Sequence, residues 1–401
     1  MTQIFFCTRA VTGKDRVLVS LVFFSAVLET NGVYDMNPLK LATPVKTANK
    51  NYEAWLRSRV KLVRTDLATK HKVMAGSPFI FLRGTFFRWA EIFPLMLPSL
   101  MECPELVGVG DLHIENFGTW RDHEGRLAWG INDFDESFPM PYANDLVRLA
   151  TSALFAIKDS RLSLEAKDVC KILVRNYTET LSDGGSPIVL AEDNQELGKM
   201  ARERLKNPAR FYKNMQRQTQ SRTGVPKEAE EALLSICPEP GLDMHYYHRT
   251  AGVGSLGRER YLILAQYRGG LIARECKNAV PSAWGFIHSQ GVKDPDKLYI
   301  NDLIKGAHRS PDPFLGVHGQ WIRRRLAPDC ARVELDDLPV ARDEEILVSS
   351  MGTETANVHL SNEKVAQAVL DDLAKKPKNW LCDSALIMYE ATVKDWKAWK
   401  A

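Results

Sequence analysis

Apolar residues recur at helical spacing over long parts of the chain, and this pattern predicts a mainly helical protein. Residues 48–72 predict a first helix, and most of residues 341–400 are expected to be helical. From Asn144 to about residue 236 the pattern predicts several successive helices, with Asn144 as the N-cap residue of the first one. One face of that first helix carries Leu146, Leu149, Ala150, Ala153 and Leu154.

Short apolar runs that end in turn residues predict β-strands elsewhere. Residues 77–90 are expected to pass from a short strand, through Arg83-Gly84, into a helix. Residues 259–266 and 271–278 predict two strands joined by the turn Arg268-Gly269-Gly270. A helix is expected near residues 295–307, and the other predicted strands are 106–110, 127–132 and 318–326. The pattern is that of an α+β protein with a helical part, a strand-containing part and then further helices.

The composition is that of a globular protein. Of the 401 residues, 45% are apolar and 26% charged, and a chain of this length can form two lobes, each with its own core. The formal net charge of +3 is close to balance, so bulk charge does not indicate a nucleic-acid partner. The seven cysteines include no C-x-x-C pair, which fits a reducing compartment, and we expect a cytoplasmic protein.

The N-terminal segment has several interpretations. Residues 17–28 form an apolar run behind Lys14 and Arg16, as in a signal peptide. The run is too short to span a bilayer, and no A-x-A-like cleavage site follows it. Residues 1–35 therefore have three interpretations. The start codon is assigned too far upstream and Met36 opens the protein, or the segment is a genuine targeting signal, or it is an ordinary buried element. No membrane span is expected.

Two predicted strands end in polar residues of the kind that phosphotransferases use. The first stretch, residues 107–118, reads V-G-V-G-D-L-H-I-E-N-F-G, and the second, from residue 131, reads I-N-D-F-D-E. Asp111 and Asn116 have the D-x-x-x-x-N spacing of a kinase catalytic loop, and Asp133 stands where the metal-binding Asp would stand. In that chemistry Asp111 accepts the proton of the attacking hydroxyl, while Asn116 and Asp133 hold Mg²⁺ against the nucleotide phosphates.

Two neighbours extend this candidate site. Asp135 is a possible second acid at the metal, and His113 is expected to assist a substrate hydroxyl or to hold the loop. The alternative is that Asp111 caps a turn and that the acidic residues from Asp133 to Glu136 form a solvated loop.

A second motif lies far downstream. Residues 252–257 read G-V-G-S-L-G, which places Gly252, Gly254, Ser255 and Gly257 in a glycine-rich loop of the kind that lets backbone N–H groups approach phosphate. The loop precedes two strands rather than a helix, and the second strand carries Lys277. This is the kinase arrangement, in which a lysine on a nearby strand reaches the phosphates of ATP. The alternative for Lys277 is a solvent-facing strand residue.

Together these motifs resemble known families. G-D-L-H-I-E-N with N-D-F-D is similar to the paired motifs of the aminoglycoside and choline phosphotransferases. The whole set resembles more closely a bacterial family known only as a domain of unknown function, related to the protein kinase-like superfamily. The motifs of this resemblance span residues 77–360: S-P-F-x-F-L-R-G, G-D-L-H-x-x-N-F-G, N-D-F-D-E, D-L-V-R-L, G-x-G-S-x-G and G-x-x-x-A-x-x-H.

The resemblance implies a two-lobed, protein kinase-like fold, but the order of the motifs is reversed, because the glycine-rich loop follows Asp111 in the chain. We therefore expect a circularly permuted arrangement. Residues 36–245 form a helical lobe with the catalytic loop, residues 246–330 a β-rich nucleotide lobe, and residues 331–401 helices that complete the larger lobe.

Some residues have provisional roles in this arrangement. Asp145 is expected to brace the backbone of the catalytic loop, and His359 to be a packing residue. No Glu lies between Lys277 and Asp312, so Glu275 or Asp302 is expected to be the partner acid of Lys277. Arg83 is expected to contact phosphate or to form an ion pair with Asp133 or Asp145.

The leading hypothesis is an ATP- and Mg²⁺-dependent phosphotransferase acting on a hydroxyl of a small molecule. The alternatives are transfer of AMP to a protein hydroxyl, a non-catalytic nucleotide-binding pseudokinase, and a metallophosphoesterase. The last needs further His ligands of the G-N-H kind, and none occurs in the sequence.

Overall fold

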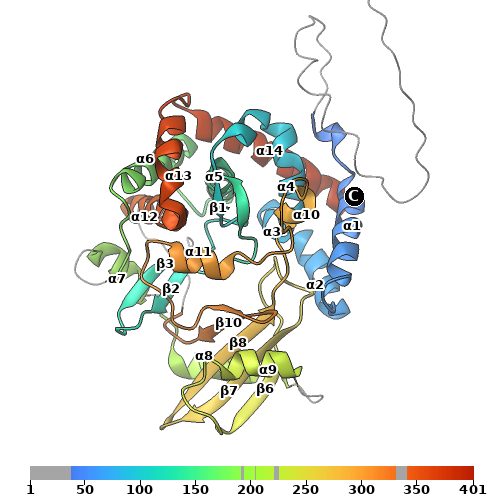
Figure 1. The fold of residues 1–401 in the computed structure, drawn as a ribbon, viewed down its shortest axis with the longest axis vertical. Coiled ribbons are helices and arrows are strands. Elements are labelled where there is room, and N and C mark those ends of the chain that lie inside the picture. Colours follow the sequence, from blue (N-terminus) through green and yellow to red (C-terminus); the bar gives the residue numbers. More distant parts are fainter. Residues whose placement is uncertain (1–37, 191–193, 204, 221–224, 331–340) are drawn as a thin grey trace, which may run out of the picture.

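The protein has an α+β fold, as predicted. The computed structural model describes residues 38–190, 194–203, 205–220, 225–330 and 341–401, so the predicted extension at 1–35 lies outside the described residues. Figure 1 shows a larger helical part above an antiparallel sheet. No helix among the described residues combines the length and apolar character that a bilayer crossing requires.

The larger part is built around helix α5 (Ala143–Lys158), which contacts α6 (Ala166–Ser182) and α14 (Trp380–Lys400). The helix α12 (Ala341–His359) packs along α6 (Figure 1). The other long helices here are α1 (Val45–Arg57), α2 (Arg64–Met74), α4 (Phe86–Met96) and α13 (Glu363–Leu373). The shorter ones are α3 (Pro78–Gly84), α7 (Gln195–Glu203), α10 (Ala283–Ile287) and α11 (Ile300–Gly306).

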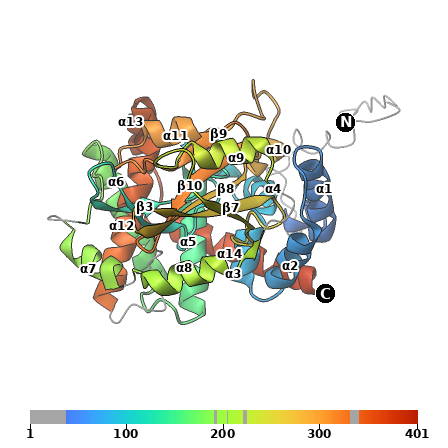
Figure 2. The ribbon, with the colours of Figure 1, turned by 90° about the horizontal axis from the view of Figure 1, so that it is seen from below.

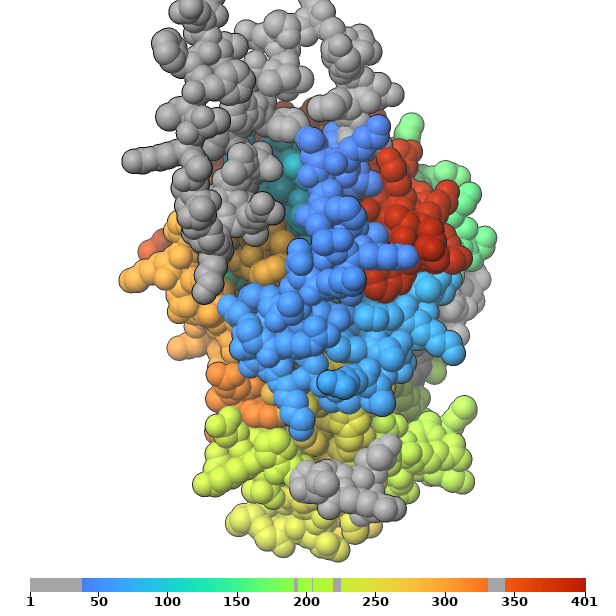
Figure 3. Space-filling model, turned by 90° about the vertical axis from the view of Figure 1, so that its right-hand side faces the viewer, coloured from blue at the N-terminus to red at the C-terminus, as the bar shows by residue number. Residues whose placement is uncertain are grey.

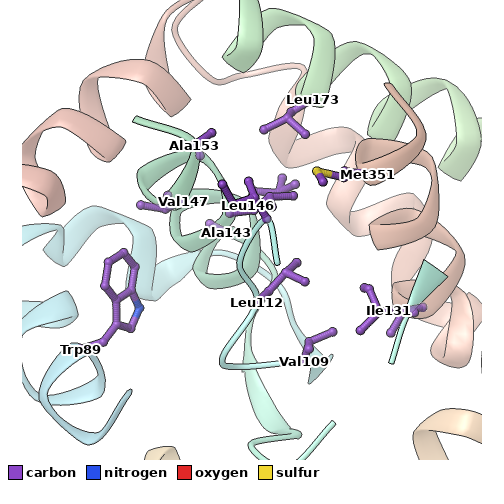
Figure 4. Close-up of a cluster of buried hydrophobic side chains, with 14 of the residues drawn as sticks. Trp89, Val109, Leu112, Ile131, Ala143, Leu146, Val147, Ala153, Leu173 and Met351 are labelled. Atoms are coloured by element: carbon purple, nitrogen blue, oxygen red, sulfur yellow. The ribbon is translucent and has the colours of Figure 1, made fainter. Parts of the chain in front are cut away.

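The core of this part fixes the chain around Asp111. Figure 4 shows Leu146 and Val147 of α5 among side chains from α4, α6 and α12. Val109 and Leu112 belong to the same buried cluster. Val109 and Leu112 lie on either side of Asp111 in the chain, and their burial anchors the loop that carries Asp111.

Three sequence-based expectations for this part are wrong in detail. Residues 77–82 form not a strand but the start of α3, where the Ser77 hydroxyl caps the Ile80 N–H at 3.1 Å; a short apolar run does not distinguish helix from strand. The predicted helix 48–72 is two helices, α1 and α2. Asn144 lies inside α5 rather than at its N-cap, and its side-chain oxygen accepts a hydrogen bond from Trp89.

The strands form three antiparallel sheets. Two are small: β1 (Glu105–Gly108) pairs with β4 (Phe138–Pro141), and β2 (Phe117–Arg121) pairs with β3 (Leu127–Ile131). The third has the strand order β5-β6-β7-β8-β10-β9. Its strands are β5 (Thr219–Gln220), β6 (Met244–His248), β7 (Arg260–Tyr267), β8 (Gly270–Asn278), β9 (Gly316–His318) and β10 (Trp321–Leu326). The predicted hairpin is β7–β8.

The six-stranded sheet lies between two short helices, as Figure 2 shows from below. The helix α9 (Lys227–Leu234) covers one face through Ala229, Ala232 and Leu233. On the opposite face, the apolar end of the sheet is partly covered by Tyr212 and Met215 of α8 (Pro208–Gln216). The rest of this second face is charged, and it is the face that the candidate site uses.

The N-terminal helices join the C-terminal helix and the sheet. Trp396 and Trp399 of α14 donate their indole N–H groups to the carbonyls of Ala75 and His71, at 3.3 and 3.4 Å. Figure 3 shows α1 and α2 in blue beside the end of α14 in red, above the yellow-green surface of the sheet region. The helix α2 is thus fixed on one side by the helical part and lies next to the sheet on the other.

Candidate active site

The loop after β1 is fixed by one buried carboxylate. The backbone N–H groups of Val109 and Gly110 donate to Oδ2 and Oδ1 of Asp145, at 2.6 and 2.9 Å. Gly110 has a φ of +82°, and a Cβ there would lie 2.4 Å from the carbonyl oxygen of Glu136, so glycine is required. The predicted bracing of this loop by Asp145 is confirmed.

His359, at the end of α12, holds Asp145 in turn. The ring is buried, as expected of a packing residue, but it also makes two polar contacts. Its Nε2 lies 2.9 Å from Oδ2 of Asp145, and its Nδ1 lies 2.8 Å from the hydroxyl of Tyr177. The last turn of α12 therefore supports the loop of Asp111 through Asp145.

The two carboxylate oxygens of Asp111 have different surroundings. Its Oδ1 accepts a hydrogen bond from Nε of Arg148 at 3.0 Å, and this guanidinium is fully buried over the rings of Phe86 and Trp89. Its Oδ2 faces the glycine-rich loop, since a Cβ on Gly254 would lie 3.4 Å from it. Burial raises the pKa of the Asp111 carboxyl, and the charge of Arg148 acts in the opposite direction.

Asn116 lies between the two acidic segments. Its Nδ2 donates to the carbonyl oxygens of Asp111 and Asp133, at 3.3 and 3.0 Å. Its Oδ1 is buried and has no hydrogen-bond partner among the described residues. An acceptor that is buried without a partner is costly, and a bound cation is one group that would satisfy it.

Lys277 binds both carboxylates of the second segment. Its Nζ lies 3.0 Å from Oδ1 of Asp133 and 2.6 Å from Oδ1 of Asp135. The other oxygen of Asp135 pairs with Nη2 of Arg258 at 2.8 Å. Burial opposes the charged form of Asp133, yet the adjacent Lys277 holds its pKa well below the ordinary value. The acidic segment is therefore an ion-paired cluster and not a solvated loop.

The donor set in this cluster suits a hard divalent cation. Asp133, Asp135 and Asn116 offer two carboxylates and the partnerless amide oxygen. Mg²⁺ is usually bound by one or two carboxylates together with substrate phosphates and water, not by a cage of protein ligands. No group of three or more His, Cys, Asp or Glu side chains that could hold a metal ion occurs in the described part of the chain.

The glycine-rich loop closes over these residues. Gly252, with a φ of +74°, starts a turn in which its carbonyl accepts the N–H of Ser255 at 3.2 Å. A cavity of about 40 Å³ lies between this loop and the acidic segments. Its walls include most of the predicted site residues: Arg83, Asp111, His113, Asn116, Asp133, Asp135, Gly252, Gly254 and Ser255.

The other two predicted residues lie outside the walls of this cavity. Lys277 reaches it through Asp133 and Asp135. Gly257, with a φ of +100°, faces α2 instead, where a Cβ would lie 2.4 Å from Cδ2 of Leu67. Its role is the close packing of the loop on that helix.

Arg83 has a different ion-pair partner from the two predicted. It pairs not with Asp133 or Asp145 but with Glu115, which also binds Arg161 at 3.0 Å. Glu115 is nearer because it lies in the same loop as Asp111, opposite the end of α3. The Nε of Arg83 is buried and has no hydrogen-bond partner among the described residues.

A larger cavity of about 780 Å³ adjoins the small one and shares Arg83, Asp133, Gly252 and Val253 with it. Its volume is in the range typical of small-molecule sites. It lies between the charged face of the six-stranded sheet and the helical part. Its apolar walls include Trp120, Phe211, Met215, Leu315 and Leu326, and charged side chains from the sheet and from other segments line much of the rest.

The helix α2 braces the glycine-rich loop, which the sequence did not predict. The buried Nζ of Lys70 donates to the carbonyl of Gly254 at 3.0 Å, and burial lowers the pKa of Lys70 to about 8. Asp66 accepts hydrogen bonds from His248 and Thr250, just before the loop, at 3.1 and 3.2 Å. A polar residue on an amphipathic helix has no sequence signal that separates this role from solvent exposure.

The expected partner acids of Lys277 are both wrong. Glu275 binds three arginines, Arg249, Arg260 and Arg324, and Asp302 pairs with Lys297 at 2.7 Å. Lys277 shares a sheet face with Glu275, but its long side chain extends to the aspartates of the helical part. Alternation along a strand gives the face of a side chain, not which of several ions it meets.

Comparisons with known proteins give one match. Residues 62–233 match the model of a family described as "Uncharacterized protein conserved in bacteria (DUF2252)". The matched segment contains Asp111, Asn116 and Asp133, and it ends before the glycine-rich loop. No curated protein and no solved structure matches the chain. The predicted resemblance to an uncharacterised bacterial family is confirmed, and the relation to the kinase-like superfamily stays a prediction.

Proposed function

We propose that this protein is an ATP- and Mg²⁺-dependent phosphotransferase that acts on a hydroxyl of a small molecule. The observation that carries the proposal is the position of the glycine-rich loop over Asp111, with Gly254 so close that a Cβ would lie 3.4 Å from the carboxylate. Phosphoryl transfer depends mainly on positioning and on neutralising charge, and the small cavity brings together the groups that both tasks require.

Asp111 is the base in this proposal. Its Oδ1 is held by Arg148, so Oδ2 is the atom that faces the acceptor hydroxyl. As the hydroxyl oxygen bonds to the γ-phosphorus, the bond from that phosphorus to the bridging oxygen breaks and ADP leaves. The hydroxyl proton passes to Oδ2 of Asp111. A raised pKa makes this carboxylate a better proton acceptor near neutral pH.

Asp133, Asp135 and Asn116 would hold the metal, and Lys277 has to shift from the two carboxylates toward the phosphates for a divalent cation to bind. Bound Mg²⁺ supplies positive charge against the nucleotide phosphates. Asn116 also fixes the distance between the two acidic segments, because its amide binds the backbone of both.

The fold in this proposal is a circularly permuted kinase-like fold. Three observations support it. The glycine-rich loop precedes β7, and the lysine is on β8, which pairs with β7. The cavity of about 780 Å³ lies between this sheet and a larger helical part, where a nucleotide base and ribose would fit. The loop with Asp111 belongs to the helical part, although it comes earlier in the chain.

Ligand-induced stabilisation tests the proposal. ATP with Mg²⁺ is expected to raise the melting temperature of the wild type, and Asp133→Ala is expected to lose the Mg²⁺-dependent part of this shift. Asp111→Asn should keep nucleotide binding and lose transfer, which mass spectrometry of a hydroxyl acceptor library incubated with ATP would detect. The mass added to the product also separates phosphoryl from AMP transfer.

The proposal fails if ATP with Mg²⁺ leaves the melting temperature unchanged. Loss of nucleotide binding in a folded Asp111→Asn variant would contradict the role of Asp111 as base.

A second candidate function is nucleotide binding without catalysis. The observation that favours it is that Lys277 binds both proposed metal-ligand carboxylates. In that case ATP would bind equally well with and without Mg²⁺, and the wild type would transfer no phosphate to any acceptor and hydrolyse no ATP.

A further inference from the structure

Three arginines in the wall of the larger cavity share one buried carboxylate. Glu275, whose side chain is 1% exposed, pairs through Oε1 with Arg260 and Arg324, both at 2.7 Å, and through Oε2 with Arg249. The three guanidiniums come from different segments of the chain, which are the start of β7, the strand β10 and the connection after β6.

The register of the sheet explains why they meet. Arg324 is directly opposite Glu275 in the β10–β8 pair, and Arg260 is opposite Lys277 in the β7–β8 pair. Residues opposite one another, and residues two apart on one strand, project from the same face of a sheet. These side chains therefore lie on the charged face that borders the larger cavity, and Arg249, Arg260 and Arg324 all line it.

The cluster has more positive than negative charge. Three guanidiniums share a single carboxylate, while the nearby Asp133 and Asp135 are bound by Lys277 and Arg258. Two positive charges of the cluster are thus without a carboxylate of their own among the described residues. Burial lowers the pKa of Arg260, and the charges of Arg324 and Arg249 act in the same direction, whereas the charges of Glu275 and Asp133 outweigh burial and raise the pKa of Arg324. The side chains of Arg249 and Arg324 are 17% and 23% exposed and line the larger cavity, so an anion in the cavity can reach both guanidiniums and balance the positive charge.

The position of the cluster indicates what kind of anion. Arg260 donates from Nη2 to the hydroxyl of Ser255 at 2.5 Å, so its guanidinium lies directly under the glycine-rich loop. The cavity continues from there to Asp133. An anion on the arginines would lie between the backbone of the loop and the proposed metal ligands, and guanidinium groups suit phosphate oxygens because of their paired N–H donors.

We propose that Arg249, Arg260 and Arg324 form the binding site for the polyphosphate chain of a nucleoside triphosphate. This inference rests on the proposed function for the identity of the nucleotide. It adds to Lys277, which the sequence predicts for the phosphate contacts, a cluster that no sequence motif identifies.

Calorimetric titration tests the inference. ATP and inorganic tripolyphosphate are titrated, each with and without Mg²⁺, into the wild type, Arg249→Gln and Arg324→Gln. The matched control is Arg323→Gln, because Arg323 neighbours Arg324 on the opposite face of β10 and donates to Ser235 at 2.6 Å. We expect each cluster variant to bind ATP and tripolyphosphate about 10- to 100-fold more weakly, the range for a lost charged hydrogen bond, and the control to bind as the wild type does.

The outcomes separate this inference from the proposed function. If the wild type binds ATP and the folded cluster variants bind it unchanged, the inference is wrong and the function stands. If tripolyphosphate binds in an arginine-dependent way but ATP does not, the cluster is a polyphosphate site and the proposed function is wrong. Binding of neither ligand overturns both. If the variants do not fold, competition in the wild type decides, because tripolyphosphate must displace ATP.

Discussion

Replacing Asp145 with Asn removes the charge that fixes the loop of Asp111, at almost constant volume. The carboxylate is fully buried and accepts the N–H groups of Val109 and Gly110, while His359 lies 2.9 Å away. An Asn amide can accept only one of the two N–H groups, because its NH₂ group faces the other. One charged hydrogen bond becomes neutral, and one buried donor is left without an acceptor.

The expected loss follows from these contacts. A hydrogen bond to a charged group contributes about 1.5–3 kcal/mol, and an unsatisfied buried donor costs about 1–3 kcal/mol. We therefore expect Asp145→Asn to lower the free energy of unfolding by about 3–5 kcal/mol. Urea denaturation followed by tryptophan fluorescence measures it as a lower midpoint with an unchanged slope.

The matched control is Asp168→Asn, on the exposed side of α6, where the carboxylate is 53% exposed and pairs with Lys171. Its free energy of unfolding should change by less than about 0.5 kcal/mol. A loss below about 1 kcal/mol in Asp145→Asn would refute the reasoning, because the loop would then be held by its apolar anchors and not by the carboxylate.

Three further substitutions probe other contacts of the fold. The pKa of Lys70 in the folded protein, about 8, is below its ordinary value of 10.5, so its stabilising contribution is present above the unfolded pKa and is lost as the pH falls through about 8. Between pH 10 and pH 7, the free energy of unfolding of Lys70→Met should therefore rise by up to about 3 kcal/mol relative to that of the wild type. A difference between the two proteins that is the same at both pH values would contradict this. Gly257→Ala should lower the free energy of unfolding by about 1–3 kcal/mol in thermal unfolding, because its Cβ would overlap Leu67 and its φ is +100°. The control Gly125→Ala has open space around the new Cβ, so only the strain of its positive φ should lower the stability. Asp395→Asn, which breaks the buried pair with Arg88, should cost about 3–5 kcal/mol, and a cost like that of an exposed pair would show that solvent reaches it.

The parts of the fold that follow local rules could be predicted from the sequence. The β7–β8 hairpin can be predicted because the turn Arg268-Gly269-Gly270 separates two apolar runs, and the structure shows positive φ at Arg268 and Gly269. A run as short as residues 77–82 has no period that separates helix from strand, so the Ser77 cap is the local signal of the helix that the structure shows. The strand β4 cannot be predicted in this way because it contains Pro139 and Pro141, which β-strands disfavour.

The candidate site likewise has parts that follow local sequence patterns and parts that depend on long-range contacts. The residues of the two local motifs could be identified from spacing alone, and the structure brings Asp111, Asp133 and Gly254 to the walls of one cavity. The ion pair of Arg148 with Asp111 and the hydrogen bond of Lys70 to the Gly254 carbonyl cannot be predicted, because contacts between distant segments have no period and no fixed spacing. The partner of Lys277 was mistaken for the same reason.

The contacts that assemble the site join residues far apart in the chain. Lys70 and Gly254 are separated by 184 positions, Asp133 and Lys277 by 144, and Asp145 and His359 by 214. Closing such long loops slows folding, since their entropy is lost before the contacts form. During synthesis the loop of Asp111 emerges before His359, Gly254 and Lys277 exist, so a nascent or truncated chain carries its acidic segments without their counter-ions. Ligand binding at this site would therefore report that synthesis and folding are complete.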